Sequence, residues 1–91
     1  MIKGTTTSGF NFEIDENTLN NMEFVDALAE VEENPLMIST VIKMMLSPDQ
    51  KKRLYDHLRT EDGRVPVEAI GVEMRDIFAV ASGESVEIKN S

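Results

Sequence analysis

Cysteine is absent from this chain of 91 residues, and its absence excludes disulfide bonds, thiolate zinc sites and thiol catalysis. Histidine is nearly absent, because His57 is the only one, and a metal ligand needs companions at helical or turn spacing. No stretch approaches the roughly 18 apolar residues that cross a bilayer, and the first residues lack the apolar segment of a signal peptide. We therefore expect a protein without a membrane segment that stays in the reducing cytosol where it is made.

Positive charge is also scarce, since 9 lysines and arginines face 17 aspartates and glutamates, which leaves a net charge of −8. Residues 11–34 contain no base at all, whereas most of the basic side chains fall within residues 43–64. An overall acidic field repels phosphate, so ordinary nucleic-acid binding is not expected. The apolar fraction of 41% and the short length predict a single folded domain over residues 1–91.

The patterning predicts a mainly α fold, a small bundle of about four helices with a short N-terminal β-hairpin or extended strand. Residues 10–15 alternate apolar and polar side chains, which is the period of a half-buried strand. A turn at residues 8–9 would pair them with residues 2–7. We assign residues 1–15 to this strand or hairpin, residues 20–82 to the helical bundle, and residues 83–91 to a flexible tail.

Four helices are expected within residues 20–82. Asn20 and Glu23 form a capping box for the first, which ends before Pro35. Pro35 suits the first turn of a second helix that reaches Leu46, and Ser47 then caps a third helix. The last helix, as one piece or two, ends at residues 82–83 and carries an apolar stripe of Ile70, Met74, Ile77, Phe78 and Ala81.

Two features resemble chemical sites, but a structural interpretation suits both better. The turn around Gly63 has a glycine where a calcium loop has one, yet the first and last ligand positions of such a loop are apolar here. A plain turn with a left-handed glycine is therefore expected. His57 lies at the margin of an apolar helix face, where we expect it to be solvated or bonded to Asp56 or Glu61. We predict no catalytic residue, no cofactor and no metal ligand.

One candidate for partner binding is an acidic stripe on the first helix, formed by Glu23, Asp26, Glu30 and Glu33. Like charges three and four residues apart cost a helix about 0.2–0.5 kcal/mol per pair. Three interpretations stay open for the stripe: a solvated face, pairing within the fold to Lys51, Lys52 and Arg53, or a surface that docks a basic partner segment.

The other candidate is the helix over residues 36–46, whose apolar arc spans about 200°, far wider than one packed face requires. Flexible thioethers fill cores and also line grooves that accept varied apolar helices, and both interpretations stay open for its methionine pair. Our hypothesis is that four of its side chains contact a partner while the acidic stripe steers the encounter: Ile38, Val41, Met44 and Met45.

The order of these features resembles the small tail assembly chaperones of long-tailed phages and prophages of Gram-positive bacteria. The resemblance is carried by FNFEID at residues 10–15, VDALAEVEENP at 25–35, MMLSPDQKKRL at 44–54, DHLRTEDGRVPVEAI at 56–70 and EMRDIF at 73–78. It implies a protein of the host cytoplasm that binds the tape measure protein, helps recruit tail tube subunits and is absent from the mature virion. The resemblance also implies that a longer frameshifted form is often made, and it supplies no binding residues.

Two other classes of function stay open. Small acidic phage proteins can mimic a phosphate row and inhibit a DNA-binding protein, although the basic third helix argues against this. A structural joining protein of the virion is the second alternative, and an enzyme is the least favoured class. A homo-oligomer is also compatible with the sequence, whereas a nucleic acid or a membrane is not an expected partner.

Overall fold

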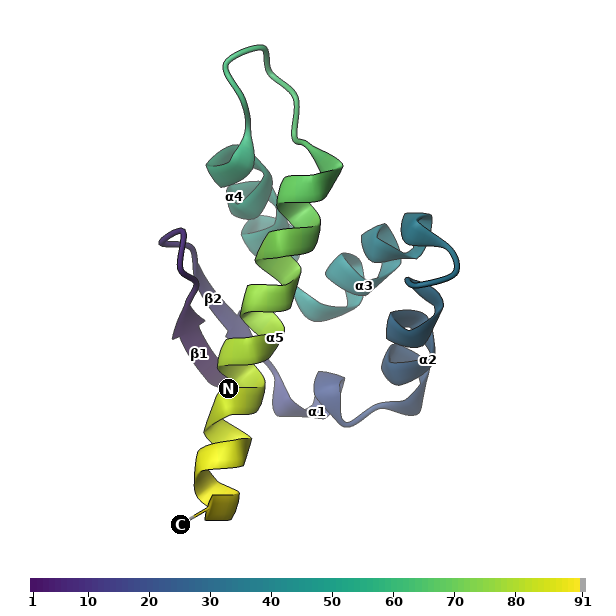
Figure 1. Ribbon diagram of the computed structural model, residues 1–91, viewed down its shortest axis with the longest axis vertical. Coiled ribbons are helices and arrows are strands. Elements are labelled where there is room, and N and C mark those ends of the chain that lie inside the picture. Colours follow the sequence, from purple (N-terminus) through teal and green to yellow (C-terminus); the bar gives the residue numbers. More distant parts are fainter. Residues whose placement is uncertain (91) are drawn as a thin grey trace.

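A computed structural model describes the backbone of residues 1–90 and the side chains of residues 1–81. The fold is mainly helical with an N-terminal two-stranded hairpin, which confirms the predicted class (Figure 1). The elements follow one another as β1 (Ile2–Thr5), β2 (Asn11–Ile14), α1 (Glu16–Leu19), α2 (Met22–Glu30), the 3₁₀ helix η1 (Pro35–Met37), α3 (Ile38–Met45), α4 (Pro48–Leu58) and α5 (Val67–Asn90).

The hairpin pairs β1 and β2 antiparallel, with Gly4 opposite Phe12. Its turn closes through a hydrogen bond from the Thr6 amide to the Phe10 carbonyl at 2.9 Å, and Gly9 supplies the positive φ of +94°. The alternation seen in the sequence places the side chains of β2 correctly, because Phe12 and Ile14 are buried while their neighbours are exposed. The predicted hairpin is therefore confirmed.

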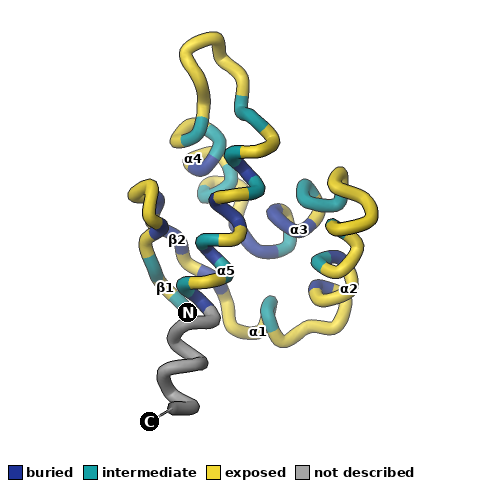
Figure 2. Tube along the Cα trace, in the orientation of Figure 1, coloured by how far each residue is buried: buried dark blue, intermediate teal, exposed yellow. Residues whose placement is uncertain are grey.

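One core joins the hairpin to the helices. The helix α5 lies against β1, and α2 packs against α3 on the other side of the molecule (Figures 1 and 2). The predicted stripe of α5 faces this core, since all its members are buried except the half-buried Phe78. The most deeply buried side chains are Phe12, Ile14, Val41, Ile42, Leu54, Met74 and Ile77.

The start of the first predicted helix was wrong by one residue, and a short helix before it was missed. Asp15 caps α1 by accepting from the Asn17 amide at 2.9 Å, and Asn20 ends that helix instead of starting the next. Asn21 is the cap of α2, because its side chain accepts from the Glu23 amide at 3.0 Å. Two consecutive asparagines offer the same capping chemistry, so local sequence alone does not select between them.

The later helix starts agree with the sequence. Asn34 caps η1 with Pro35 in its first turn, and the chain passes from this 3₁₀ turn directly into α3. Ser47 caps α4 by accepting from the Gln50 amide at 3.2 Å, as predicted.

The predicted end of the last helix at residues 82–83 was wrong. The helix α5 is one piece that continues through Gly83 to Asn90. A glycine inside a helix costs only about 1 kcal/mol relative to alanine, and no proline follows to stop it. Residues 83–91, for which we predicted a flexible tail, lie outside the residues whose side chains the structure describes. Their flexibility therefore stays a prediction.

Candidate functional site

The helix that we expected to present an apolar surface is mostly sealed by its own neighbours. Val41 is 0% exposed and Met45 only 4%, so neither side chain is on the surface where our hypothesis placed it. Met44 and Ile38 are half-buried at the edge of the core. Close packing of α2 and α3 uses the wide apolar arc, because a central helix must bury more than one face.

An apolar groove nevertheless opens beside the start of this helix. It lies between η1 with the first turns of α3, the loop before α5, and the first turn of α5, and Tyr55 of α4 contributes to its lining. Its volume is about 280 Å³. The groove is lined by Pro35, Leu36, Ile38, Ser39, Ile42, Tyr55, Val65, Val67 and Ile70.

Two large aliphatic side chains stand open at this groove. Leu36 is 82% exposed and Val67 is 71% exposed, although their neighbours Ile42 and Ile70 belong to the core. Leu36 occupies the middle of the one-turn η1, and Val67 is the first residue of α5. Each therefore lies in the first turn of a helix, where the rest of the protein does not cover its side chain. Sequence periodicity gave no signal for this pair, because the two segments are about 30 residues apart in the chain.

Every member of the acidic stripe is exposed. Glu23, Asp26 and Glu30 lie on α2, whereas Glu33 lies in the turn after it. Within residues 1–81, whose side chains are described, none of these carboxylates forms an ion pair. Of the alternatives considered for the stripe, pairing with the bases at residues 51–53 is therefore not the one that the described side chains adopt.

Two of these three bases, Lys52 and Arg53, instead pair with acids of their own helix. Lys52 and Arg59 both contact the Asp56 carboxylate at 3.1 Å, and Arg53 lies 3.5 Å from Asp49. The hydrogen bond from Lys52, followed by that from Arg59, lowers the pKa of Asp56. Local pairs within one helix thus neutralise much of the positive charge and leave the negative field of α2 uncompensated.

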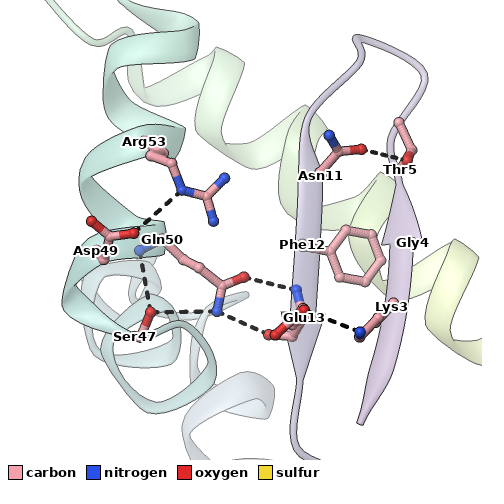
Figure 3. Close-up of a pocket in the computed structure, with 10 residues that line it drawn as sticks. All are labelled: Lys3, Gly4, Thr5, Asn11, Phe12, Glu13, Ser47, Asp49, Gln50 and Arg53. Atoms are coloured by element: carbon pink, nitrogen blue, oxygen red, sulfur yellow. Dashed lines mark hydrogen bonds and ion pairs between the residues drawn. The ribbon is translucent and has the colours of Figure 1, made fainter.

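A second, more open groove lies between the hairpin and α4, and its volume is about 600 Å³ (Figure 3). The Gln50 side chain spans it, donating to the Glu13 carbonyl at 3.0 Å and accepting from the Glu13 amide at 2.7 Å. Lys3 also lies 3.5 Å from the Glu13 carboxylate. These polar groups form hydrogen bonds and an ion pair with one another. The bonds between Gln50 and Glu13 therefore hold β2 and α4 together across the groove.

His57 belongs to a polar cluster that the sequence did not indicate. His57 is exposed, which agrees with the solvated alternative of our prediction, and its Nε2 lies 3.0 Å from the Ser8 hydroxyl instead of bonding Asp56 or Glu61. The Ser8 hydroxyl donates to the Glu73 carboxylate at 2.7 Å, and the Thr6 hydroxyl donates to the same oxygen at 2.6 Å. In the sequence, Ser8 and Thr6 are separated from Glu73 by 65 and 67 positions. Local spacing therefore gave no sign of the cluster.

The proton positions in this cluster decide what it can do. Ser8 has one hydroxyl proton, and it is directed to Glu73, so the Nε2–H of His57 must donate to Ser8. That polarity is the reverse of a serine–histidine nucleophile pair, in which imidazole accepts the serine proton. Glu73 is only 3% exposed, and the cluster holds the hairpin turn against α5.

The turn around Gly63 has the structure that we expected. Gly63 has φ of +89°, and its amide donates to the Thr60 carbonyl at 3.0 Å. Thr60 and Arg64 both hydrogen-bond the Asp62 carboxylate, and the Thr60 contact followed by the Arg64 contact lowers the pKa of Asp62. This carboxylate is already saturated by donors from its own turn.

Comparison of the chain with models of known families, with curated proteins and with solved structures found no match. No helix within the described residues combines the length and apolar character needed to cross a membrane. The candidate site therefore rests on two surfaces, the acidic stripe of α2 and the apolar groove beside η1.

Proposed function

We propose that this protein is a tail assembly chaperone of a long-tailed phage or prophage, which binds the tape measure protein and helps recruit tail tube subunits. The resemblance in the order of sequence features suggests this function. Support from the physical side comes from a small acidic fold that keeps apolar side chains exposed beside a row of carboxylates with no ion-pair partner among the side chains of residues 1–81.

The observation that carries the proposal is the exposure of Leu36 at 82% next to the acidic α2. The 3₁₀ helix that holds Leu36 packs against α2, so apolar and acidic surfaces adjoin. A long helical client exposes apolar stripes before its partners assemble around it, and covering these stripes prevents aggregation. Surrounding acids speed the encounter with basic segments and keep the loaded complex soluble.

The test is co-expression with the tape measure protein of the phage or prophage whose genome encodes this chain. The tape measure protein should be soluble and co-purify when the chain is present, and it should be insoluble without it. A tape measure protein that is equally soluble in both cultures contradicts the proposal. Finding the chain in purified mature particles would favour the structural joining protein instead.

A further inference from the structure

We infer that the groove lined by Leu36 and Val67 binds one amphipathic helix of a partner, a few of whose apolar side chains fill the groove and whose flanks are basic. This inference deepens the proposed function by naming the segment that the chaperone recognises. It also moves the contact surface from the buried Val41 and Met45 to residues that a partner can reach.

The size of the groove limits its occupant to a few side chains. Its volume of about 280 Å³ is at the lower limit of small-ligand sites, which span roughly 300–1,000 Å³. The lining is almost wholly apolar, with Ser39 and the Tyr55 hydroxyl as its polar side-chain groups. Such a surface offers little to orient a polar ligand, whereas aliphatic side chains fit it well.

The backbone of the occupant must satisfy its own hydrogen bonds. The groove is walled by η1, α3, α4, α5 and the loop before α5, and neither β1 nor β2 contributes to it. An extended peptide would bring amide and carbonyl groups that find no strand ladder to join. A helix has these groups paired internally, so a helix is the conformation that this groove accepts.

Charge selects a basic partner over a second copy of this chain. Glu33 lies three residues before Leu36, and Glu68 follows Val67, and both glutamates are exposed. The stripe on α2 adds further carboxylates without an ion-pair partner among the described side chains. A second copy would bring another net charge of −8 to a chain that already carries −8, and this long-range repulsion disfavours a dimer.

The experiment uses the full chain and a synthetic helical peptide of about 18 residues, with leucines at i, i+3, i+4 and i+7 and lysines elsewhere. Its twin carries glutamates in place of lysines. Fluorescence anisotropy should show binding of the basic peptide, and binding of the acidic twin should be at least tenfold weaker. Added salt should weaken the basic complex, because exposed charges are screened.

Two substitutions on the protein test the groove itself. Leu36→Ser and Val67→Ser should each weaken binding of the basic peptide about ten- to hundredfold, because each loses burial of an aliphatic side chain. The matched control is Val72→Ser, which lies on the same helix as Val67, is 63% exposed and is outside the groove. It should bind as the unmodified chain does, and circular dichroism should show all three variants folded.

Three outcomes overturn the inference. The first is equal binding of the basic peptide by Leu36→Ser and Val72→Ser, and the second is equal binding of the basic and acidic peptides by the unmodified chain. The third is a dimer of the free chain that dissociates when Leu36→Ser is introduced. Each failure is distinguishable from failure of the proposed function. Co-purification of the tape measure protein unaffected by Leu36→Ser would leave the chaperone and reject the groove. If the basic peptide binds in the groove but the chain does not change the solubility of the tape measure protein, the groove stands and the chaperone function is rejected.

Discussion

Replacing Glu73 by alanine should lower the stability of the fold more than any exposed substitution on the same helix. The Glu73 carboxylate is 3% exposed and accepts from the hydroxyls of Thr6 and Ser8 at 2.6 and 2.7 Å. Its removal also leaves the buried Thr6 hydroxyl without its acceptor. The hairpin turn would then lose part of its polar attachment to α5, while the hydrogen bond from the Thr7 amide to the Asp76 carboxylate remains.

The magnitude follows from the two hydrogen bonds. A hydrogen bond to a charged group contributes about 1.5–3 kcal/mol, so two set an upper limit near 3–6 kcal/mol. Loss of a buried charge recovers part of this, because its desolvation cost disappears. Thr6 also keeps a contact with the Ser8 hydroxyl at 3.2 Å. We therefore expect Glu73→Ala to cost about 2–3 kcal/mol, and Glu73→Gln, which keeps a neutral acceptor, about 1 kcal/mol.

Urea unfolding followed by far-ultraviolet circular dichroism measures these changes, since the chain has no tryptophan for fluorescence. With m near 1–3 kcal/mol/M, a loss of about 2–3 kcal/mol should lower the urea midpoint of Glu73→Ala by about 0.7–3 M. Arg75→Ala, exposed on the same helix, controls for the change in helix propensity. Equal midpoints for Glu73→Ala and Arg75→Ala would refute the reasoning, because the buried carboxylate would then contribute nothing measurable.

Three further predictions concern stability. Gly4→Ala should cost about 1–3 kcal/mol in urea unfolding, because a Cβ there would lie 2.7 Å from the Phe12 ring; an unchanged midpoint would contradict this. Ser47→Ala should cost about 0.5–2 kcal/mol through loss of the α4 cap, and Ser47→Asp, which keeps an acceptor, should restore it. The pKa of Asp56 lies below its ordinary 3.8, chiefly through the hydrogen bond from Lys52. Its small contribution to the free energy of unfolding is therefore present above pH 3.8 and is lost as the pH falls through the lower pKa of the folded state. Asp56→Asn should make the urea midpoint depend less on pH in this acid range.

Much of the local structure could be predicted because its causes are local. The alternation at residues 10–15 gave the hairpin, and the Ser47 cap with the following proline gave the start of α4. The apolar stripe of α5 was predicted with every member facing the core. Each of these signals lies within one helix, one helix cap or one strand, where residues that are near neighbours in the sequence decide the conformation.

The candidate site was only partly predictable. The exposed acidic stripe follows from the helical spacing of its glutamates, and the structure leaves it without ion pairs among the described side chains. The groove could not be predicted, since Leu36 and Val67 line it from two separate segments, η1 and α5. The sequence showed that the apolar arc of α3 is unusually wide, but Val41 and Met45 in this arc are buried in the core.

The amino-acid sequence by itself determined the helical class, the hairpin, most helix starts and the separation of charge along the chain. Those properties depend on residues that are near neighbours, whose spacing sets both capping and amphipathic faces. Only the tertiary structure decided which apolar side chains stay exposed and which polar ones meet, as Ser8 does with His57 and Glu73. The physical reason is that burial and pairing are properties of segments brought together through space, and no local pattern records which segments those are.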